Sequence, residues 1–392
     1  MRLGPLFLSL TATLTFVSPP AAPRAEKVEL VRVPNGGIQP ELAVDATGTL
    51  HMVYLAGEPA SADVFYVRSA DGGCTFSDAI RVNSQPGSAI ATGTIRGAHV
   101  AVGRNGRVHV AWNGSSGALP QPPVDPKTGR AGMPMLYARS KPEGTAFEPQ
   151  RNLMTATLHL DGGGSIAADD GGGVYVAWHG NAVGGEEGEQ ARRVWIARSA
   201  DDGATFGSER PVSEASAGVC GCCALRLAVT SRGELHLLYR SARETVHRDI
   251  YSLVSTDRGA TFTSERLHGW EIGACPMTSM SIVPGTPLLR AWETEGQVYF
   301  NRTGNRAEPT SPALEPGVTP RRKHPRLAVN AAGTVLLVWA DGTAWNRGGS
   351  VAWQAISRDG KPTEVKGIQA GVPVWSFAAV LARPDGSFAI FY

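Results

Sequence analysis

A hairpin phrase that recurs along the chain limits the fold more than any other feature of the sequence. Each copy has a short apolar strand, a turn that contains glycine, and a second apolar strand that ends in an aromatic residue. Such a phrase is typical of two antiparallel strands joined by a tight turn. The clear copies are residues 42–54, 100–112, 166–178, 227–239 and 327–339, and the weaker ones are 282–292 and 379–392. They begin about 45–67 residues apart, which is the period of the blades of a β-propeller.

A second pattern occupies three of the turns that follow these hairpins. It reads Ser-x-Asp-x-Gly-x-Thr-Phe and begins at Ser69, Ser199 and Ser255. The aspartate can accept hydrogen bonds within its own turn, and the glycine supplies a positive φ angle. We therefore predict a structural rather than a catalytic role for the Asp and Gly residues of the pattern, which are Asp71, Gly73, Asp201, Gly203, Asp257 and Gly259.

This turn pattern is the Asp box, and with it the chain resembles the sialidase-like, BNR-repeat β-propeller superfamily. The resemblance implies an all-β propeller of four-stranded blades, six of them in sialidases. The hairpin phrases here make six full units and a partial seventh, Phe377 to Tyr392, so seven blades are favoured over six. The segment Val28 to Val33 has no blade of its own, and we expect it to close the ring by completing the last blade.

The start of the chain is typical of a secretory signal peptide. Met1-Arg2 precedes an apolar run from Leu3 to Val17, and small residues continue to Ala25. We therefore predict a signal peptide at residues 1–25, a single propeller domain at 26–392, and an exported protein. The apolar run is shorter than the roughly 20 residues of a membrane-spanning helix, so no membrane span is expected. The net charge of +2 argues against nucleic acid as a partner.

Arginine and histidine residues gather in the loops on one face of the expected propeller. These loops lead into the innermost strands or follow the second strands, so they lie near the central channel. Guanidinium groups bind carboxylates in a bidentate manner. We predict a site for a carbohydrate or another small acidic ligand, formed by Arg96, His99, His179, Arg240, Arg248, His324 and Arg326. The alternative is that these residues form a solvated charged rim.

The sequence leaves open whether this face is catalytic. The family resemblance implies exo-sialidase chemistry, with three arginines, a tyrosine nucleophile activated by glutamate, and an aspartate as acid and base. The Phe/Tyr-Arg-Ile/Leu-Pro motif of that family is absent. The acidic candidates for hydrolysis of a glycan on this face are Glu244, Asp249, Glu293 and Glu295.

Four of the five cysteines should meet at the channel mouth. Cys220, Cys222 and Cys223 lead into the inner strand of the fourth unit, and Cys275 leads into that of the fifth. The first interpretation is a disulfide, most simply from Cys222 or Cys223 to Cys275. The second is a soft-metal site for Cu(I) or Zn, and no other cofactor is expected.

The same cysteine pattern resembles that of a subgroup of exported bacterial BNR-repeat proteins. Members of this subgroup often have histidine after the Cys-Pro pair, where Met277 stands here. Two hypotheses about function follow from the whole sequence. The first is an exported sialidase-like propeller that binds or hydrolyses an acidic carbohydrate. The alternative is a non-catalytic propeller that binds a ligand, a metal or a protein, with the cysteine cluster at its mouth.

Overall fold

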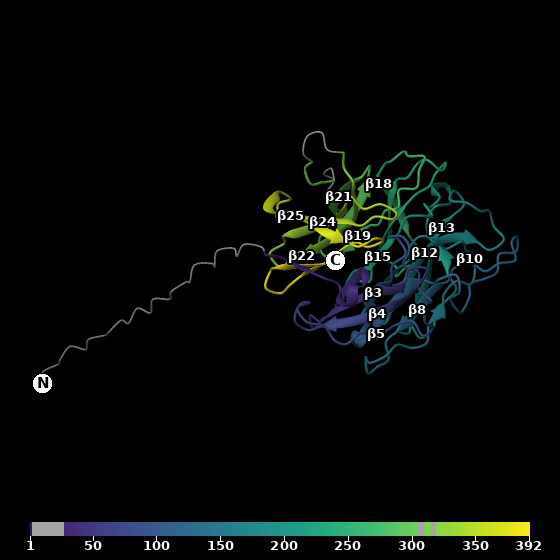
Figure 1. Ribbon diagram of the computed structural model, residues 1–392, viewed down its shortest axis with the longest axis horizontal. Helices are drawn as coiled ribbons and strands as arrows, with labels where there is room; N and C mark the ends of the chain where they lie inside the picture. The colour runs from purple at the N-terminus through teal and green to yellow at the C-terminus, as the bar shows by residue number, and fades with distance from the viewer. Residues whose placement is uncertain (2–26, 305–308, 315–318) are drawn as a thin grey trace.

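Seven β-sheets follow one another around a ring, and the strand labels from β3 to β25 in Figure 1 run around it in chain order. The computed structural model describes residues 1, 27–304, 309–314 and 319–392. Apart from Met1, the expected signal peptide at residues 1–25 lies outside the described residues. The sequence prediction of an all-β propeller with seven blades is confirmed.

The first four blades each contain an antiparallel meander of four strands. Their bounds, from the innermost strand outward, are β2 (Ile38–Val44), β3 (Leu50–Glu58), β4 (Ser61–Ser69) and β5 (Ile80–Arg81); β6 (His99–Val102), β7 (Val108–Asn113), β8 (Met135–Arg139) and β9 (Arg151–Asn152); β11 (Ser165–Ala168), β12 (Val174–Ala182), β13 (Arg193–Ser199) and β14 (Arg210–Pro211); β15 (Arg226–Val229), β16 (Leu235–Arg240), β17 (Ile250–Ser255) and β18 (Thr263–His268). The short strand β10 (Thr157–Leu158) pairs with the end of β12.

The remaining three blades are less uniform. The strands of the fifth are β19 (Ser281–Val283), β20 (Leu289–Thr294) and β21 (Gln297–Arg302); those of the sixth are β22 (Arg322–Val329), β23 (Val335–Asp341), β24 (Gly349–Ile356) and β25 (Pro362–Val372); those of the seventh are β26 (Ala379–Ala382), β27 (Phe388–Phe391) and β1 (Val28–Val31). A bridge between Phe300 and Thr310 extends the fifth blade outward.

The N-terminal strand closes the ring, as predicted. β1 pairs with the C-terminal strand β27 from Val28 opposite Phe388 to Val31 opposite Phe391. The pairing is parallel, so β1 takes the third place in the blade rather than continuing an antiparallel meander. The contact ties the two ends of the described propeller together and covers an edge that would otherwise expose unpaired backbone groups.

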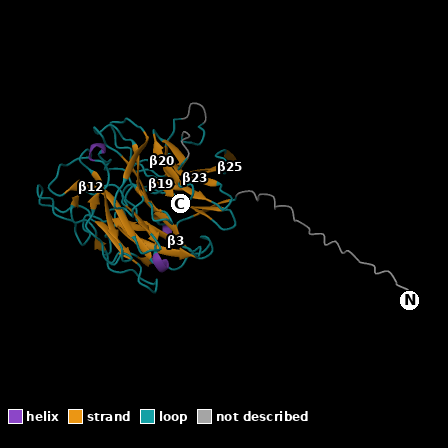
Figure 2. Cartoon of the chain, turned by 180° about the vertical axis from the view of Figure 1, so that it is seen from behind, coloured by secondary structure: helices purple, strands orange, loops and turns teal. Residues whose placement is uncertain are grey.

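The innermost strands form the inner wall of the ring. Each contacts the next in the order β2, β6, β11, β15, β19, β22 and β26, and β26 contacts β2 again. Their side chains therefore face a common central channel. Strands account for most of the regular structure, and Figure 2 shows them from behind with only short helical turns between them. Within the described residues, no helix has the length and apolar character needed to cross a membrane.

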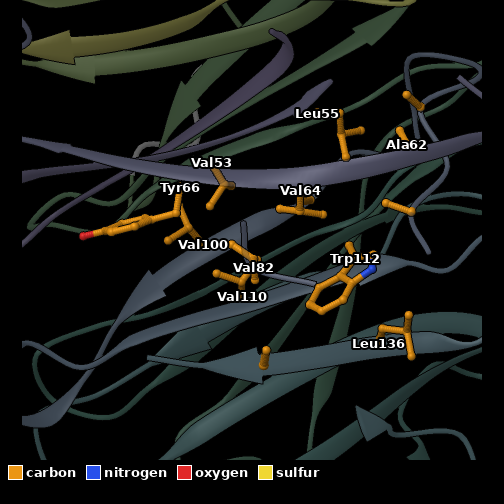
Figure 3. Packing of buried hydrophobic residues seen from close by; sticks show 14 of the residues in the cluster. Val53, Leu55, Ala62, Val64, Tyr66, Val82, Val100, Val110, Trp112 and Leu136 are labelled. Carbon is orange, nitrogen blue, oxygen red and sulfur yellow. The ribbon is translucent and has the colours of Figure 1, made fainter. Parts of the chain in front are cut away.

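Apolar side chains fill the interfaces between neighbouring blades. Between the first two blades, Val53 and Val64 pack with Val110 and Trp112 (Figure 3). A similar cluster of buried residues lies at every other interface of the described ring. The near-continuous apolar runs of the hairpin phrases produce this arrangement, because a blade must bury both faces of its sheet.

The Asp-box turns connect the third and fourth strands of their blades. In the first, the Asp71 carboxylate accepts hydrogen bonds from Ser69 Oγ (2.7 Å), the Thr75 backbone N–H (2.9 Å) and Thr75 Oγ1 (2.6 Å). These bonds hold the pKa of Asp71 well below its usual range. Gly73 has a φ of +85°, and a side chain there would collide with the Phe391 ring of the last blade. The contacts within and around this turn are thus those of a structural element.

Candidate functional site

The loops that lead into the innermost strands make one continuous surface, which, together with the loops that follow the second strands, we call the mouth face. Hydrogen bonds join these loops from blade to blade: Gln39 to Ala91 (2.7 Å), Arg96 to Asp161 (3.0 Å), Gly162 to Gly221 (2.7 Å), Ala224 to Thr278 (3.0 Å) and Lys323 to Pro276 (2.6 Å). The mouth face is therefore a connected surface, on which groups from different blades keep a fixed relative position.

A charged network fills the channel just below this face. Arg326 Nη2 donates to Glu41 Oε1 (2.6 Å), and Arg226 Nη1 donates to Glu41 Oε2 (2.7 Å). Arg226 Nη1 also lies 3.1 Å from Nδ1 of His99. The four residues come from the innermost strands β2, β6, β15 and β22. Since β15 and β22 are not neighbours of β2 in the ring, the Glu41 side chain must reach across the channel.

The electrostatics of the network follow from burial and charge pairing. Burial alone would raise the pKa of Glu41, but the two guanidinium groups outweigh it and lower this pKa to about 2. Burial lowers the pKa of His99 to about 3, although the Glu41 charge opposes this shift. At neutral pH the network thus contains two cations, one carboxylate and a neutral imidazole.

Sequence reasoning selected His99 and Arg326 for this face but missed Glu41 and Arg226. A signal was present, because each of the four residues stands directly before the apolar start of a hairpin phrase. In the structure the side chains at this shared position point into the channel, where they contact one another. Both arginines are already paired with a carboxylate of the protein, so a ligand carboxylate would have to compete with Glu41 for them.

Arg240 and Arg248 belong to a second buried group, beside the fourth blade. Arg240 is 1% exposed, donates to the Arg248 carbonyl oxygen (2.5 Å), and lies over the Trp270 ring at 5.0 Å. Arg248 Nη2 donates to Glu189 Oε2 (2.6 Å). The other Glu189 oxygen accepts the Gly221 backbone N–H (2.6 Å). These arginines therefore brace the loop that carries the cysteines.

The other three residues selected as ligand-binding are held by protein contacts as well. His179 is buried, and its Nε2 lies 2.9 Å from the Cys223 carbonyl oxygen. His324 is buried, and its Nδ1 lies 3.0 Å from Ser279 Oγ. Arg96 forms an ion pair with Asp161, whose side chain is 38% exposed. Of these three, Arg96 lies nearest to open solvent.

The four acidic candidates occupy different environments, and no hydrogen bond between described residues brings any two of them together. Glu244 is exposed and contacts Arg243 (3.0 Å). Asp249 is buried, and it accepts hydrogen bonds from Arg266 Nε (2.7 Å) and the Trp270 backbone N–H (2.9 Å).

The remaining two acidic candidates lie at the end of β20 and just beyond it. Glu293 is buried; one of its oxygens accepts the Gly296 N–H (2.7 Å), and burial raises its pKa. Glu295 is exposed in the following turn. The geometry therefore favours a structural role for Asp249 and leaves Glu244 and Glu295 on the solvated rim.

The cysteines meet at the mouth face, as the repeat geometry predicts. Cys222 and Cys275 form a disulfide with their Cα atoms 6.3 Å apart, one of the two pairings expected for Cys275. Cys220 and Cys223 are buried thiols whose sulfur atoms lie 2.8 Å apart, and Cys74 is an exposed thiol in its Asp-box turn.

The two buried thiols differ in acidity. Burial raises the pKa of the Cys220 thiol. Burial also acts to raise the pKa of the Cys223 thiol, but the hydrogen bond from Cys220 and the charge of Arg240 outweigh it and lower this pKa. Ligand atoms of Cys220, Cys222 and Cys223 all lie within 4.8 Å of one another, so this cluster could hold a metal ion.

A shallow pocket of about 40 Å³ opens on the mouth face beside the sixth blade. Its lining residues are Thr94, Met277, Lys323, His324, Thr343, Ala344, Trp345 and Trp375. The rings of Trp345 and Trp375 meet edge to face with their centroids 6.3 Å apart, and Trp345 is 46% exposed. Trp375 Nε1 is buried and has no hydrogen-bond partner within the described residues.

Lys323 supplies the positive charge of this pocket. Its Nζ donates to the Pro276 carbonyl oxygen (2.6 Å), and it makes no contact ion pair with a carboxylate of the described chain. None of Lys323, Trp345 and Trp375 was selected from the sequence. Trp345 and Trp375 lie in loops between strands, where the repeat gives no guide to how side chains converge.

Comparisons with known proteins agree with this architecture. Neither the models of known protein families nor the curated protein sequences give a match to the chain. Among solved structures, an α-L-arabinanase of Penicillium chrysogenum with arabinobiose has a TM-score of 0.51 at 14% identity, over 84% of this chain and 95% of that one. The GH93 α-L-arabinofuranosidase of Fusarium graminearum with arabinobiose has a TM-score of 0.51 at 13% identity, over 85% and 98%.

The Hadza microbial sialidase Hz136 matches with a TM-score of 0.49 at 16% identity. The match covers 86% of this chain, which spans only 66% of the length of that sialidase. The chain has the β-propeller fold of the arabinanase and the arabinofuranosidase. At such low identity the likeness extends to the fold alone, so the chemistry of the site must be argued from the residues of this chain.

Proposed function

We propose that this protein is an exported propeller that binds an acidic carbohydrate at the mouth face. The observation that carries the proposal is the pocket in which Trp345 and Trp375 lie beside Lys323. Aromatic rings offer flat apolar surfaces on which the C–H groups of a sugar ring can pack. An ammonium group that lacks a carboxylate partner can bind the acid group of the same ligand.

The pocket also contains polar groups that could orient a sugar. The indole N–H of Trp375 has no partner in the described chain, and a buried donor without a partner is costly to leave unsatisfied. Thr94 and Thr343 line the same pocket and can each donate or accept a hydrogen bond. Arg96 lies close by, since a side chain at Gly93 would meet both its guanidinium group and the Trp345 ring.

The direct test is a titration of the purified protein with sialylated, uronic-acid-containing and neutral oligosaccharides of matched length, followed by calorimetry. We expect binding of an acidic glycan that Trp345→Ala weakens at least tenfold. Ile368→Ala is the matched control, because Ile368 is an exposed apolar residue on the outer strand β25. Absence of binding to every glycan, or equal binding by Trp345→Ala, would contradict the proposal.

Hydrolysis is measured in the same samples by product analysis after long incubation. Most glycosidases use two carboxyl groups that flank the scissile bond. Glu295 and Asp161 are exposed or partly exposed carboxylates of the mouth face, so Glu295→Gln and Asp161→Asn are the variants to compare. Release of sugar that either variant abolishes would make the protein an enzyme. Binding without release would make it a lectin-like propeller.

A second candidate function is the binding of a soft metal by the cysteine cluster. The carrying observation is the proximity of the Cys220, Cys222 and Cys223 sulfur atoms. Thiolates favour Cu(I) and Zn, although the Cys222–Cys275 disulfide leaves two thiols free in this arrangement. Elemental analysis of protein prepared without chelator tests it: near-stoichiometric copper or zinc, lost in Cys220→Ser and Cys223→Ser, would support the metal site.

A further inference from the structure

Cys220 occupies the central position among the cysteines of the mouth face. Its sulfur lies 2.8 Å from that of Cys223 and 3.5 Å from that of Cys222. Cys222 in turn is bonded to Cys275, which is exposed. A buried pair of thiols therefore lies in direct contact with a disulfide that reaches the solvent.

Two buried arginines hold the loop that carries the thiol pair. Arg240 and Arg248 are both almost fully buried, and the Arg240 carbonyl oxygen accepts a hydrogen bond from the Cys220 backbone N–H (3.0 Å). Arg248 is paired with Glu189, whereas Arg240 makes no contact ion pair with a carboxylate of the described residues. The guanidinium charge of Arg240 is therefore available to stabilise a thiolate, which is the attacking species in thiol–disulfide exchange.

We propose that these four cysteines form a thiol–disulfide exchange site, in which the Cys222–Cys275 disulfide oxidises the buried Cys220/Cys223 pair. The short distances between the sulfur atoms and the exposure of Cys275 allow this exchange without unfolding of the protein. The substrate class is a soluble thiol or disulfide, which would react at the exposed Cys275. This activity is separate from carbohydrate binding and does not depend on it.

The exchange proceeds in two steps that balance. First, the Cys220 thiol gives up its proton and the resulting thiolate attacks the Cys222 sulfur, a Cys220–Cys222 bond forms, and Cys275 leaves as a thiolate. Second, the Cys223 thiolate attacks the Cys220 sulfur, and Cys222 leaves. The buried pair has then lost two electrons and the Cys222/Cys275 pair has gained them. Two protons pass from the buried thiols to the released ones.

An external disulfide restores the Cys222–Cys275 disulfide. The Cys275 thiolate attacks it and expels one thiol, and the Cys222 thiolate then attacks the mixed disulfide and expels the second. The net reaction converts the buried dithiol and one external disulfide into a buried disulfide and two external thiols. Oxidised glutathione is a suitable probe of this class.

The exchange site is also linked to the pocket of the mouth face. Cys275 is followed by Pro276, whose carbonyl oxygen accepts the Lys323 hydrogen bond, and by Met277, which lines the pocket. Release of Cys275 should therefore loosen one wall of the pocket and weaken ligand binding. This consequence alone rests on the proposed function, and it has a separate readout from the exchange itself.

The test follows the redox state of each cysteine in the full chain. The protein is equilibrated with mixtures of reduced and oxidised glutathione, alkylated, and mapped by mass spectrometry. In the most oxidising mixtures we expect a Cys220–Cys223 disulfide beside Cys222–Cys275. At intermediate ratios we expect two populations with one disulfide each, and therefore alkylation of Cys275 in the folded protein. Cys74→Ser is the matched control and should leave both results unchanged.

Two variants separate the steps. In Cys275→Ser the exposed disulfide cannot form, and we expect oxidised glutathione to oxidise the buried pair at least tenfold more slowly. In Cys223→Ser the exchange should stop after its first step, so that Cys275 becomes alkylated in part of the folded protein. The second variant retains the Cys222–Cys275 pair and serves as the test if Cys275→Ser does not fold.

The proposal is overturned if Cys220 and Cys223 stay reduced at every glutathione ratio and react only after unfolding. It is also overturned if the buried pair of Cys275→Ser oxidises at the wild-type rate, or if Cys275 of Cys223→Ser stays unreactive. None of these measurements uses a glycan, so their failure is distinguishable from failure of carbohydrate binding.

Discussion

The carboxylate of Glu41 accepts a hydrogen bond from Arg326 at 2.6 Å, and the two residues lie 285 positions apart in the chain. The other Glu41 oxygen is bound by Arg226 from the fourth blade. One side chain thus links the first, fourth and sixth blades through the channel. The buried apolar clusters of the described residues each lie between neighbouring blades, whereas Glu41 connects blades that are not neighbours.

Loss of the Glu41 charge should destabilise the protein strongly. Glu41→Gln would leave Arg226 and Arg326 buried without their shared carboxylate. Removing one partner of a buried ion pair typically costs about 3–5 kcal/mol. Chemical denaturation measures the change, and Glu58→Gln is the control because Glu58 is exposed at the end of β3. A loss below about 1 kcal/mol would contradict a structural role for the network.

Acidification should destabilise the fold through His99. In the folded state this imidazole, packed against Arg226 with Glu41 and Arg326 nearby, has a pKa of about 3 instead of 6.5. Below pH 6.5, His99 therefore binds a proton in the unfolded chain but not in the folded chain. The stability of the folded state falls until the pH reaches about 3. Glu41 stays charged until lower pH, since its own pKa is about 2.

The size of this effect can be isolated with one variant. Linkage predicts that His99 costs about 2 kcal/mol of stability between pH 7.5 and pH 5. His99→Gln should lose that part of the pH dependence, while other buried histidines keep theirs. Denaturation curves of both proteins at the two pH values give the difference. Equal pH dependence in the two proteins would show that His99 does not titrate as described.

The Asp-box turns should contribute to stability and not to ligand binding. Asp201 accepts hydrogen bonds from Ser199 Oγ (2.7 Å), from the Thr205 N–H (2.9 Å) and from Thr205 Oγ1 (2.6 Å). Asp201→Ala removes them all, and we expect a loss of about 1 kcal/mol, the size of a lost helix cap. Asp170→Ala, at an exposed turn residue, is the control. Unchanged thermal stability of Asp201→Ala would contradict the expectation.

The sequence predicted the ring because its repeat is local. A hairpin phrase determines two strands and a turn within about 13 residues, and the period then fixes the number of blades. Closure by Val28–Val31 could be predicted because the last unit lacked strands. The parallel direction of that pairing could not, since no local pattern encodes which way a distant strand runs.

The site was less predictable because it depends on which side chains converge. The cysteines were predictable, since two neighbouring blades must bring Cys222 and Cys275 to the same place. The partner of Arg326 was not predictable. Glu41 contacts it across the channel from a blade that is not its neighbour, and the repeat spacing does not relate the two positions. The pairing of Trp345 with Trp375 also depends on two irregular loops, for which spacing offers no information.

Lys323 should control the affinity and the salt dependence of acidic ligands. Lys323→Met retains most of the apolar length of the side chain and removes its charge, so packing in the pocket is largely kept. We expect about tenfold weaker binding of an acidic glycan, equivalent to about 1.4 kcal/mol. The loss should shrink as salt is raised from 0.05 to about 0.5 M, because ions screen the pair. Binding of a matched neutral glycan should not change.

Calorimetric titrations at the two salt concentrations check this, with Lys366→Met as the control on the exposed strand β25. The hydrogen bond from Lys323 to Pro276 is lost as well, so thermal stability is measured alongside affinity. Weaker binding of acidic and neutral glycans alike would indicate that the pocket wall has moved. Selective, salt-sensitive loss for the acidic glycan would identify the Lys323 ammonium group as the contact to the acid.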